Sequence, residues 1–162
     1  MKRAIIGFHR DPRDDWVADL DCAHGQHVRH KPPFQNRSWV VTEDGRNGML
    51  GTELDCVLCD RMEWPADARA YRTREFDDAT LPAGLVRDHA TAHGVWARIH
   101  VRQGVLDYHV GEPINRTLRL AAGSVGIVVP QVRHRIEPMG RVRLRIEFAR
   151  RTRVSSSESA KE

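Results

Sequence analysis

Two short segments rich in cysteine and histidine constrain the fold of this chain more than any other feature. Residues 22–33 read CAHGQHVRHKPP, with one cysteine and three histidines within nine positions, and residues 56–59 read CVLC. A cysteine pair separated by two residues, with a Cys-x-His motif about thirty residues earlier, has the spacing of a tetrahedral zinc site. The sequence therefore predicts a small domain in which two tight turns each supply two ligands to one ion.

A tetrahedral site needs four ligands, and the predicted set is Cys22, His24, Cys56 and Cys59. His27 and His30 then lie outside this set, either as exposed or supporting residues or as part of a cationic patch that binds an anion. The alternative for residues 56–59 is a redox-active pair, but such pairs follow a strand of a βαβ unit, and this segment lacks that pattern. A loop-rich domain of about sixty residues also needs a cross-link in order to fold, and zinc supplies one.

Length and composition favour two small domains over one large domain. The chain has 162 residues, of which 6% are aromatic and 30% are charged, so we expect two modest cores, at least one of them cross-linked. No apolar run approaches the roughly 20 residues that a membrane span needs, and no apolar signal-peptide segment follows Met1. We therefore expect a soluble, cytoplasmic protein whose reduced cysteines are free to bind metal.

The formal net charge of +4 is unevenly distributed along the chain. Residues 1–64 hold 9 Lys and Arg against 11 Asp and Glu, whereas residues 65–162 hold 17 against 11. A basic strand face near the C-terminus has the charge to meet nucleic acid phosphates, but arginines of this kind commonly protect a sheet edge from aggregation. Because no aromatic residues are interleaved for base stacking and the first half is acidic, nucleic acid binding is not expected.

Hydrophobic periodicity divides the chain into two β-rich parts. Residues 2–9 and 16–20 flank the turn sequence DPRDD and predict an antiparallel hairpin that ends directly before Cys22. We assign residues 1–64 to a zinc-ribbon-like, metal-binding domain. Residues 65–79 are polar and lack a sustained apolar period, so we assign them to a linker.

The second part, residues 80–150, alternates apolar and polar residues as strands do. In residues 142–148 four apolar residues alternate with two arginines and a glutamate. Strands are expected near residues 85–89, 95–102, 105–110, 118–121, 126–129, 134–137 and 142–148. Six or seven short antiparallel strands over about seventy residues indicate a small jelly-roll barrel, so the predicted fold class is mostly β. The tail, residues 151–162, is polar and is expected to be disordered.

Both parts resemble known families. The segment GQHVRHKPP, followed by Trp39 and by LDCVLCDR, resembles a small uncharacterised bacterial family rich in Cys and His, which implies no particular activity. The segments LPAGLVRDH, GVWARIHVRQGVL, VVPQVRHRIEP and RIEFAR resemble the TehB/YeaR-like cupin domain of bacteria. This resemblance implies a cupin barrel and an association with tellurite resistance. In tellurite-resistance proteins the domain precedes a methyltransferase; we expect none here, so no role of that enzyme is carried over.

The cupin resemblance also implies a second metal site, for a divalent transition metal, at the mouth of the barrel. Cupins hold their metal through histidines from two distant strands, and His89 and His134 stand at the matching positions. His93 or Glu147 is expected to complete this site, although Glu147 has the alternative of a salt bridge to an arginine such as Arg98. The usual histidine-x-histidine motif is absent, which weakens the case for iron dioxygenase chemistry based on two histidines and a carboxylate.

Three functions follow from these observations. The favoured one is a metal-binding accessory protein in tellurite or related oxyanion stress, with a cupin pocket for a small molecule or an oxyanion. The second is a small cupin metalloenzyme, oxygenase- or isomerase-like, which needs an open metal position beside a proton-transfer group. The third, a nucleic-acid-binding regulator, is supported by the arginines alone. A homodimer is a further expectation, because cupin barrels often pair through their sheet faces.

Overall fold

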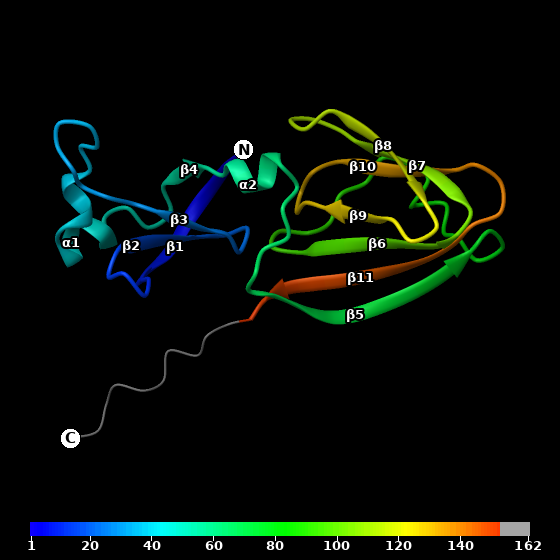
Figure 1. Cartoon of the computed structure of the whole chain (residues 1–162), viewed down its shortest axis with the longest axis horizontal. Coiled ribbons are helices and arrows are strands. Elements are labelled where there is room, and N and C mark those ends of the chain that lie inside the picture. Colours follow the sequence, from blue (N-terminus) through cyan, green and yellow to red (C-terminus); the bar gives the residue numbers. More distant parts are fainter. Residues whose placement is uncertain (153–162) are drawn as a thin grey trace, which may run out of the picture.

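The computed structural model describes residues 1–152, whose strands form three antiparallel sheets (Figure 1). The predicted fold class is confirmed: the chain is mostly β, with a Cys/His cluster in its first part and a cupin-like barrel in its second. Residues 153–162 of the predicted tail lie outside the described residues, and Arg151, the first residue of that predicted tail, instead ends a strand. None of the helices within residues 1–152 has the length and apolar character that crossing a bilayer requires.

The N-terminal sheet has the strand order β3-β2-β1-β4. Its strands are β1 (Lys2–Arg10), β2 (Trp16–Leu20), β3 (Gly25–His27) and β4 (Glu53–Asp55). Three short helices complete this part: η1 (Ser38–Val40), α1 (Glu43–Asn47) and α2 (Val57–Asp60). The predicted hairpin of β1 and β2 is confirmed. Its turn is held by the Asp11 carboxylate, which accepts hydrogen bonds from the backbone N–H groups of Arg13 (2.8 Å) and Asp15 (2.9 Å).

The other two sheets face each other and form the barrel (Figure 1). One has the order β5-β11-β6-β9, with β5 (Ala68–Asp77), β11 (Arg143–Arg151), β6 (Trp96–Gln103) and β9 (Val125–Val128). The other has the order β10-β7-β8, with β10 (His134–Pro138), β7 (Val105–Val110) and β8 (Arg116–Ala121). The apolar residues of the predicted alternation fill the space between them and are buried: Ile99, Val101, Leu106, Tyr108, Ile136, Leu144 and Ile146.

The turn between β6 and β7 requires a glycine. Gly104 has a φ of +81°, and a Cβ placed on it would meet the backbone oxygen of Arg141 at 2.1 Å. A side chain is therefore excluded by both the backbone conformation and the close approach of the neighbouring segment. The turn joins the two strands that the sequence predicts near residues 95–102 and 105–110.

The predicted linker at residues 65–79 is wrong, because these residues contain the ten-residue strand β5. β5 pairs along its length with β11, from Asp77 opposite Arg143 to Ala68 opposite Arg151. Most of its side chains are exposed on both faces, so the strand shows no apolar alternation. An edge strand of this kind is specified by its partner strand and not by its own hydrophobic pattern.

The predicted strand at residues 85–89 is also absent, apart from one residue. His89 forms an isolated antiparallel bridge with His134, with backbone N–H to O distances of 3.0 and 2.8 Å. The rest of the segment is a turn and a bend. The consequence is that the two histidines are neighbours at the end of β10.

The two parts of the chain are in direct contact. The guanidinium of the buried Arg3 donates to the backbone oxygen of Pro130 (2.9 Å). The indole of Trp96, at the start of β6, donates to the backbone oxygen of Cys22 (2.8 Å). The Cys/His-rich part therefore packs on one end of the barrel, and the contact includes one of the predicted metal ligands.

Candidate functional site

The four predicted ligands of the first site lie on two turns of the N-terminal part. Cys22 and His24 belong to the turn between β2 and β3, which is closed by a hydrogen bond from the Leu20 N–H to the His24 carbonyl (2.9 Å). Cys56 follows β4 as the N-cap of α2, and Cys59 lies within α2. All four side chains are buried. Within residues 1–152 they form the one group of three or more His, Cys, Asp or Glu side chains close enough to share a metal ion.

The distances within this cluster are those of tetrahedral zinc coordination. Zn–S bonds of about 2.3 Å and Zn–N bonds of about 2.0–2.1 Å give S–S edges of about 3.8 Å and S–N edges of about 3.6 Å. The Sγ atoms of Cys22 and Cys56 are 3.8 Å apart. The His24 Nδ1 lies 3.6 Å from the Sγ atoms of Cys22 and Cys59 and 3.4 Å from that of Cys56. A disulfide between Cys22 and Cys56 is excluded at this separation, because its S–S bond is about 2.05 Å.

The second ring nitrogen of His24 fixes the tautomer that a metal needs. Nε2 lies 3.1 Å from the backbone oxygen of Glu63. A carbonyl oxygen only accepts hydrogen bonds, so Nε2 carries the hydrogen and the lone pair is left on Nδ1, the atom that faces the three sulfurs. A carbonyl partner on the second nitrogen is typical of metal-binding histidines.

The electrostatics of the cluster favour a thiolate. Hydrogen bonds from Cys22 and Cys59 lower the pKa of the Cys56 thiol, and hydrogen bonding to Cys56 and Cys59 raises that of Cys22. Burial acts to lower the pKa of His24, but Cys56 and Cys59 outweigh it and raise this pKa to about 9. Without metal the cluster would thus pair a Cys56 thiolate with a protonated His24 at neutral pH. Zinc binding would displace the remaining protons, since the thiolate is the form that coordinates metal.

Trp96 connects this cluster to the barrel. Its side chain is fully buried, and its ring packs edge-on against His24 (centroids 5.2 Å apart) and Trp64 (6.1 Å). The next residue, Ala97, and the preceding residue, Val95, line a pocket inside the barrel. The residue that contacts the metal cluster is therefore directly adjacent in sequence to two residues of the pocket wall.

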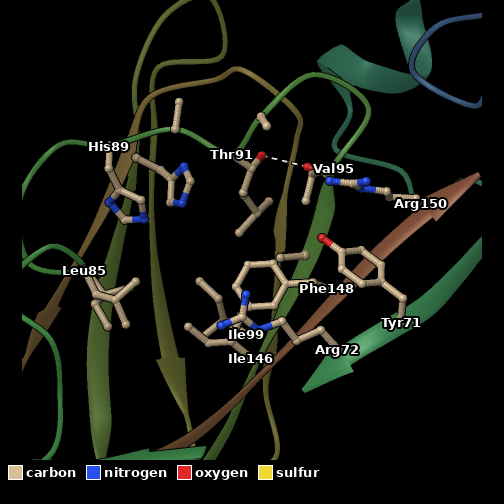
Figure 2. A pocket seen from close by; sticks show the side chains of 16 residues that line it. Tyr71, Arg72, Leu85, His89, Thr91, Val95, Ile99, Ile146, Phe148 and Arg150 are labelled. Atoms are coloured by element: carbon tan, nitrogen blue, oxygen red, sulfur yellow. Dashed lines mark hydrogen bonds between the residues drawn. The ribbon is translucent and has the colours of Figure 1, made fainter. Parts of the chain in front are cut away.

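The barrel pocket has a volume of about 290 Å³ and opens between the two barrel sheets and the segment around His89 (Figure 2). Most of its wall is apolar, formed by Leu85, Val95, Ala97, Ile99, Val128, Ile136, Ile146 and Phe148. Its polar side chains are His89, Thr91, His134, Tyr71, Arg72 and Arg150. The Thr91 hydroxyl already donates to the Val95 carbonyl (2.7 Å; Figure 2). The histidines, the arginines and Tyr71 are thus the polar groups available to a ligand.

The two histidines predicted for the second site lie side by side. The ring centroids of His89 and His134 are 4.2 Å apart. Each Nδ1 lies 2.9 Å from a backbone oxygen, that of Arg87 for His89 and that of Val132 for His134. Both rings therefore carry their hydrogen on Nδ1 and have a lone pair on Nε2, as two metal-binding histidines would.

The other two predicted ligands of the second site are elsewhere, and the prediction is wrong for them. His93 Nε2 lies 3.1 Å from the Asp21 carboxylate in the N-terminal part. Glu147 forms a salt bridge with Arg98 (3.6 Å), the alternative that we had considered. Ile146 and Phe148 line the pocket, so Glu147 between them points to the other face of the sheet.

The spare histidines of the first segment are not part of the metal cluster. His27 Nε2 lies 2.9 Å from the Asp11 carboxylate, and the His30 Nδ1 accepts a hydrogen bond from the backbone N–H of Arg37 (3.1 Å). Both contacts stabilise loops next to the hairpin. His27 and Arg29 form no cationic patch, because each is paired with a carboxylate, Asp11 for His27 and Asp15 for Arg29.

Burial of His134 has a measurable consequence for the pH dependence of stability. Burial lowers its pKa from 6.5 to about 4. Between these values the unfolded chain binds a proton that the folded chain does not, so the free energy of unfolding falls as the pH is lowered. From pH 7 to pH 5 we expect a loss of about 2 kcal/mol from this residue. Urea unfolding at both pH values, with excess zinc, should show this loss in the wild type and not in His134→Gln; an equal loss in both would contradict it.

The residues that the sequence analysis missed are those of the pocket mouth: Tyr71, Arg72 and Arg150. Tyr71 and Arg72 were missed because their segment was assigned to a linker. Residues 71–76 do show a weak two-residue period, in which Arg72, Arg74 and Phe76 share one face. This two-residue period has no apolar bias, but it is the sequence signal from which a strand could have been predicted here.

Family models match both parts of the chain. Residues 6–63 match a family described as a protein of unknown function, DUF3565, and residues 71–146 match the TehB-like domain. Both matches agree with the resemblances drawn from the sequence. None of the curated proteins compared with the chain matches it.

Several solved structures are similar to the barrel. A protein from E. coli strain K12 aligns with a TM-score of 0.50 and 22% identity, over 56% of this chain and 97% of the other. TehB from Haemophilus influenzae aligns with a TM-score of 0.48 and 20% identity, over 53% of this chain and only 32% of TehB. A cupin protein from Bacteroides fragilis has a TM-score of 0.37 and 14% identity, over 55% of this chain and 70% of the other. At these identities the first alignment supports the fold of the barrel and says nothing about its activity.

Proposed function

Because the chain carries a TehB-like domain behind a DUF3565 domain, we propose that it is a metal-binding accessory protein whose barrel takes up a small molecule. The observation that carries this proposal is the cluster of three sulfurs and one imidazole nitrogen at the spacing of tetrahedral zinc. Zinc would be held by Cys22, His24, Cys56 and Cys59.

The proposed role of this zinc is structural. Four protein ligands complete the coordination sphere, and all of them are buried, with 0–4% of each residue exposed. A catalytic zinc site typically has three protein ligands and an open position for water or substrate. The zinc would therefore hold the two turns of the N-terminal part together and, through Trp96, support one end of the barrel.

We further propose a role in tellurite or a related oxyanion stress, which rests on the TehB-like family of the barrel. In a tellurite-sensitive bacterium, expression of the wild-type chain should raise the tellurite concentration that permits growth. Cys56→Ser and His134→Ala should each reduce this protection, whereas Arg102→Gln, at an exposed position outside the barrel pocket, should retain it. If the wild type gave no protection, the proposed stress role would be wrong. The proposed metal centre would be unaffected, because it rests on the distances within the Cys/His cluster.

The alternative function is a small cupin metalloenzyme, and the pair formed by His89 and His134 favours it. Both Nε2 lone pairs are held in one tautomer by backbone carbonyls. Within residues 1–152, however, no third His, Cys, Asp or Glu side chain joins this pair, so a metal held there would depend on solvent or ligand atoms. Oxygen uptake by the Fe(II)-loaded chain that is lost in His134→Ala would support the enzyme; no uptake with any substrate tried would favour the accessory protein.

Location and assembly form the last part of the proposal. A cytoplasmic location would keep all three cysteines reduced, as the cluster requires. β5 lies at the edge of its sheet and has a partner on one side only within the described chain, and an edge of this length favours pairing with a second copy. We therefore propose a homodimer. Light scattering should give twice the mass of the 18.5 kDa chain; a monomer at all concentrations would contradict the dimer.

A further inference from the structure

The charges at the mouth of the barrel pocket indicate which ligand it takes. Arg72 of β5 and Arg150 of β11 line the pocket, and none of the lining residues is an Asp or Glu. Figure 2 shows Arg150 and Tyr71 at one end of the pocket and His89 at the other. The Arg72 side chain lies between these two ends, near Ile99 and Ile146, so the pocket holds two cationic side chains and no acidic side chain to offset them.

Neither arginine is paired with an acid. Within residues 1–152, Arg72 and Arg150 make no salt bridge or side-chain hydrogen bond; the guanidinium of Arg72 lies 6.0 Å from the Phe148 ring centroid and that of Arg150 lies 5.0 Å from the Tyr71 ring centroid. The neighbouring Arg151, by contrast, is bound to the carboxylate of Asp19. The aromatic contacts position the two guanidinium groups but leave their N–H donors free.

The opposite end of the pocket does not suit an anion. The Nδ1 atoms of His89 and His134 each face a backbone carbonyl oxygen, so their Nε2 atoms have lone pairs. A carboxylate would meet repulsion from these lone pairs. The carboxylate of a ligand is therefore expected at the arginines, whose planar guanidinium groups match the geometry of a carboxylate.

The apolar wall between the two ends makes the pocket a poor site for a purely inorganic anion. It is formed largely by aliphatic side chains and Phe148, which cannot replace the hydration shell of a small oxyanion. The volume of about 290 Å³ is at the lower end of ligand pockets, which span roughly 300–1,000 Å³. At about 30 Å³ per water-sized group, it holds a molecule of roughly ten non-hydrogen atoms.

We propose that the barrel pocket binds a small organic carboxylate with a compact apolar body, its carboxylate at Arg72 and Arg150. The body lies against Ile99, Ile146 and Phe148 and points toward the histidines. This inference rests on the proposed function, in which the barrel takes up a small molecule, and it names the chemical class of that molecule. It does not depend on whether zinc occupies the Cys/His cluster.

Calorimetric titration of the full-length, zinc-loaded chain tests the inference with four probes: benzoate, the uncharged benzamide, the cationic benzylamine and tellurite alone. Benzoate should bind, and the other three should bind at least tenfold more weakly. Arg72→Gln and Arg150→Gln should each weaken benzoate binding about ten- to hundredfold, the range for a hydrogen bond to a charged group. Arg102→Gln is the matched control, since Arg102 is exposed on β6 outside this pocket, and it should bind benzoate like the wild type.

Four outcomes would overturn the inference. Equal binding of benzamide would show that charge is not recognised, and tighter binding of tellurite would show that the apolar wall is not used. Benzoate binding that survives both arginine substitutions but is lost in His134→Ala would place the carboxylate on a metal at the histidines. If none of the four probes bound, the inference would also fail. The proposed function has a separate test: it would be wrong if the Cys/His cluster bound no zinc.

Discussion

Replacing Cys56 with serine is expected to remove zinc from the protein and to unfold residues 1–64 while the barrel stays folded. Cys56 is the central sulfur of the cluster, within 3.4 Å of the His24 Nδ1 and 3.8 Å of the Cys22 Sγ. A structural zinc site contributes apparent folding free energy of about 10–16 kcal/mol, far more than the core of a domain of this size supplies. The barrel should persist because, within residues 1–152, none of its strands pairs with a strand of the N-terminal sheet.

The measurement combines elemental analysis with limited proteolysis. The variant should contain no zinc, and its first 64 residues should be degraded under conditions in which a fragment containing β5 to β11 survives. His27→Gln is the control, since His27 lies in the same segment but contacts Asp11 and not the cluster; it should retain full zinc content. A zinc-free Cys56→Ser chain that was as resistant as the wild type would show that zinc does not hold this part together.

The second large effect is expected for Trp96→Ala. Trp96 is fully buried between the metal cluster and the barrel, and its indole N–H donates to the Cys22 carbonyl (2.8 Å). Removing a buried tryptophan side chain costs about 3–5 kcal/mol of stability. Because the ring also packs on His24, we expect the zinc affinity to fall as well. Trp96→Phe retains most of the packing but leaves the buried Cys22 carbonyl without the indole donor, so it should cost about 1–3 kcal/mol.

Urea unfolding and competition with a zinc chelator would measure the two effects. Trp39→Phe serves as the control, because Trp39 packs on Phe8 and not on the cluster; its zinc affinity should match that of the wild type. If Trp96→Ala lowered stability without changing zinc affinity, Trp96 would be an ordinary core residue. A loss in both quantities would show that the metal cluster and the barrel are energetically connected.

The ligand cluster could be predicted from the sequence because each pair of ligands is local. Cys22 and His24 belong to one turn, and Cys56 and Cys59 belong to another, so the spacing within each pair already determines that two donors face the same side. To predict that the two turns lie together, it was enough to assume that all four ligands bind the same metal ion. The succession of strands along the chain from β6 to β11 was likewise predictable from alternating apolar residues and from the glycine between β6 and β7.

The pocket could not be predicted in the same way because it is built from long-range pairing. β5 contributes Tyr71 and Arg72, yet its exposed side chains show no apolar pattern, and its position is determined by β11, about seventy residues later in the chain. Glu147 is a different case. The alternation of Ile146 and Phe148 around it already places it on the opposite face of the sheet, so the sequence contained enough information to exclude it as a ligand.

X-ray absorption at the zinc edge of the purified full-length protein tests the central claim most directly. The account predicts one zinc per chain with three sulfur neighbours at about 2.3 Å and one nitrogen neighbour at about 2.0–2.1 Å, supplied by the four residues of the cluster. A chain purified without zinc that takes none up from solution would contradict the account. So would a zinc shell of oxygen and nitrogen atoms without sulfur, since it would place the metal away from the three cysteines.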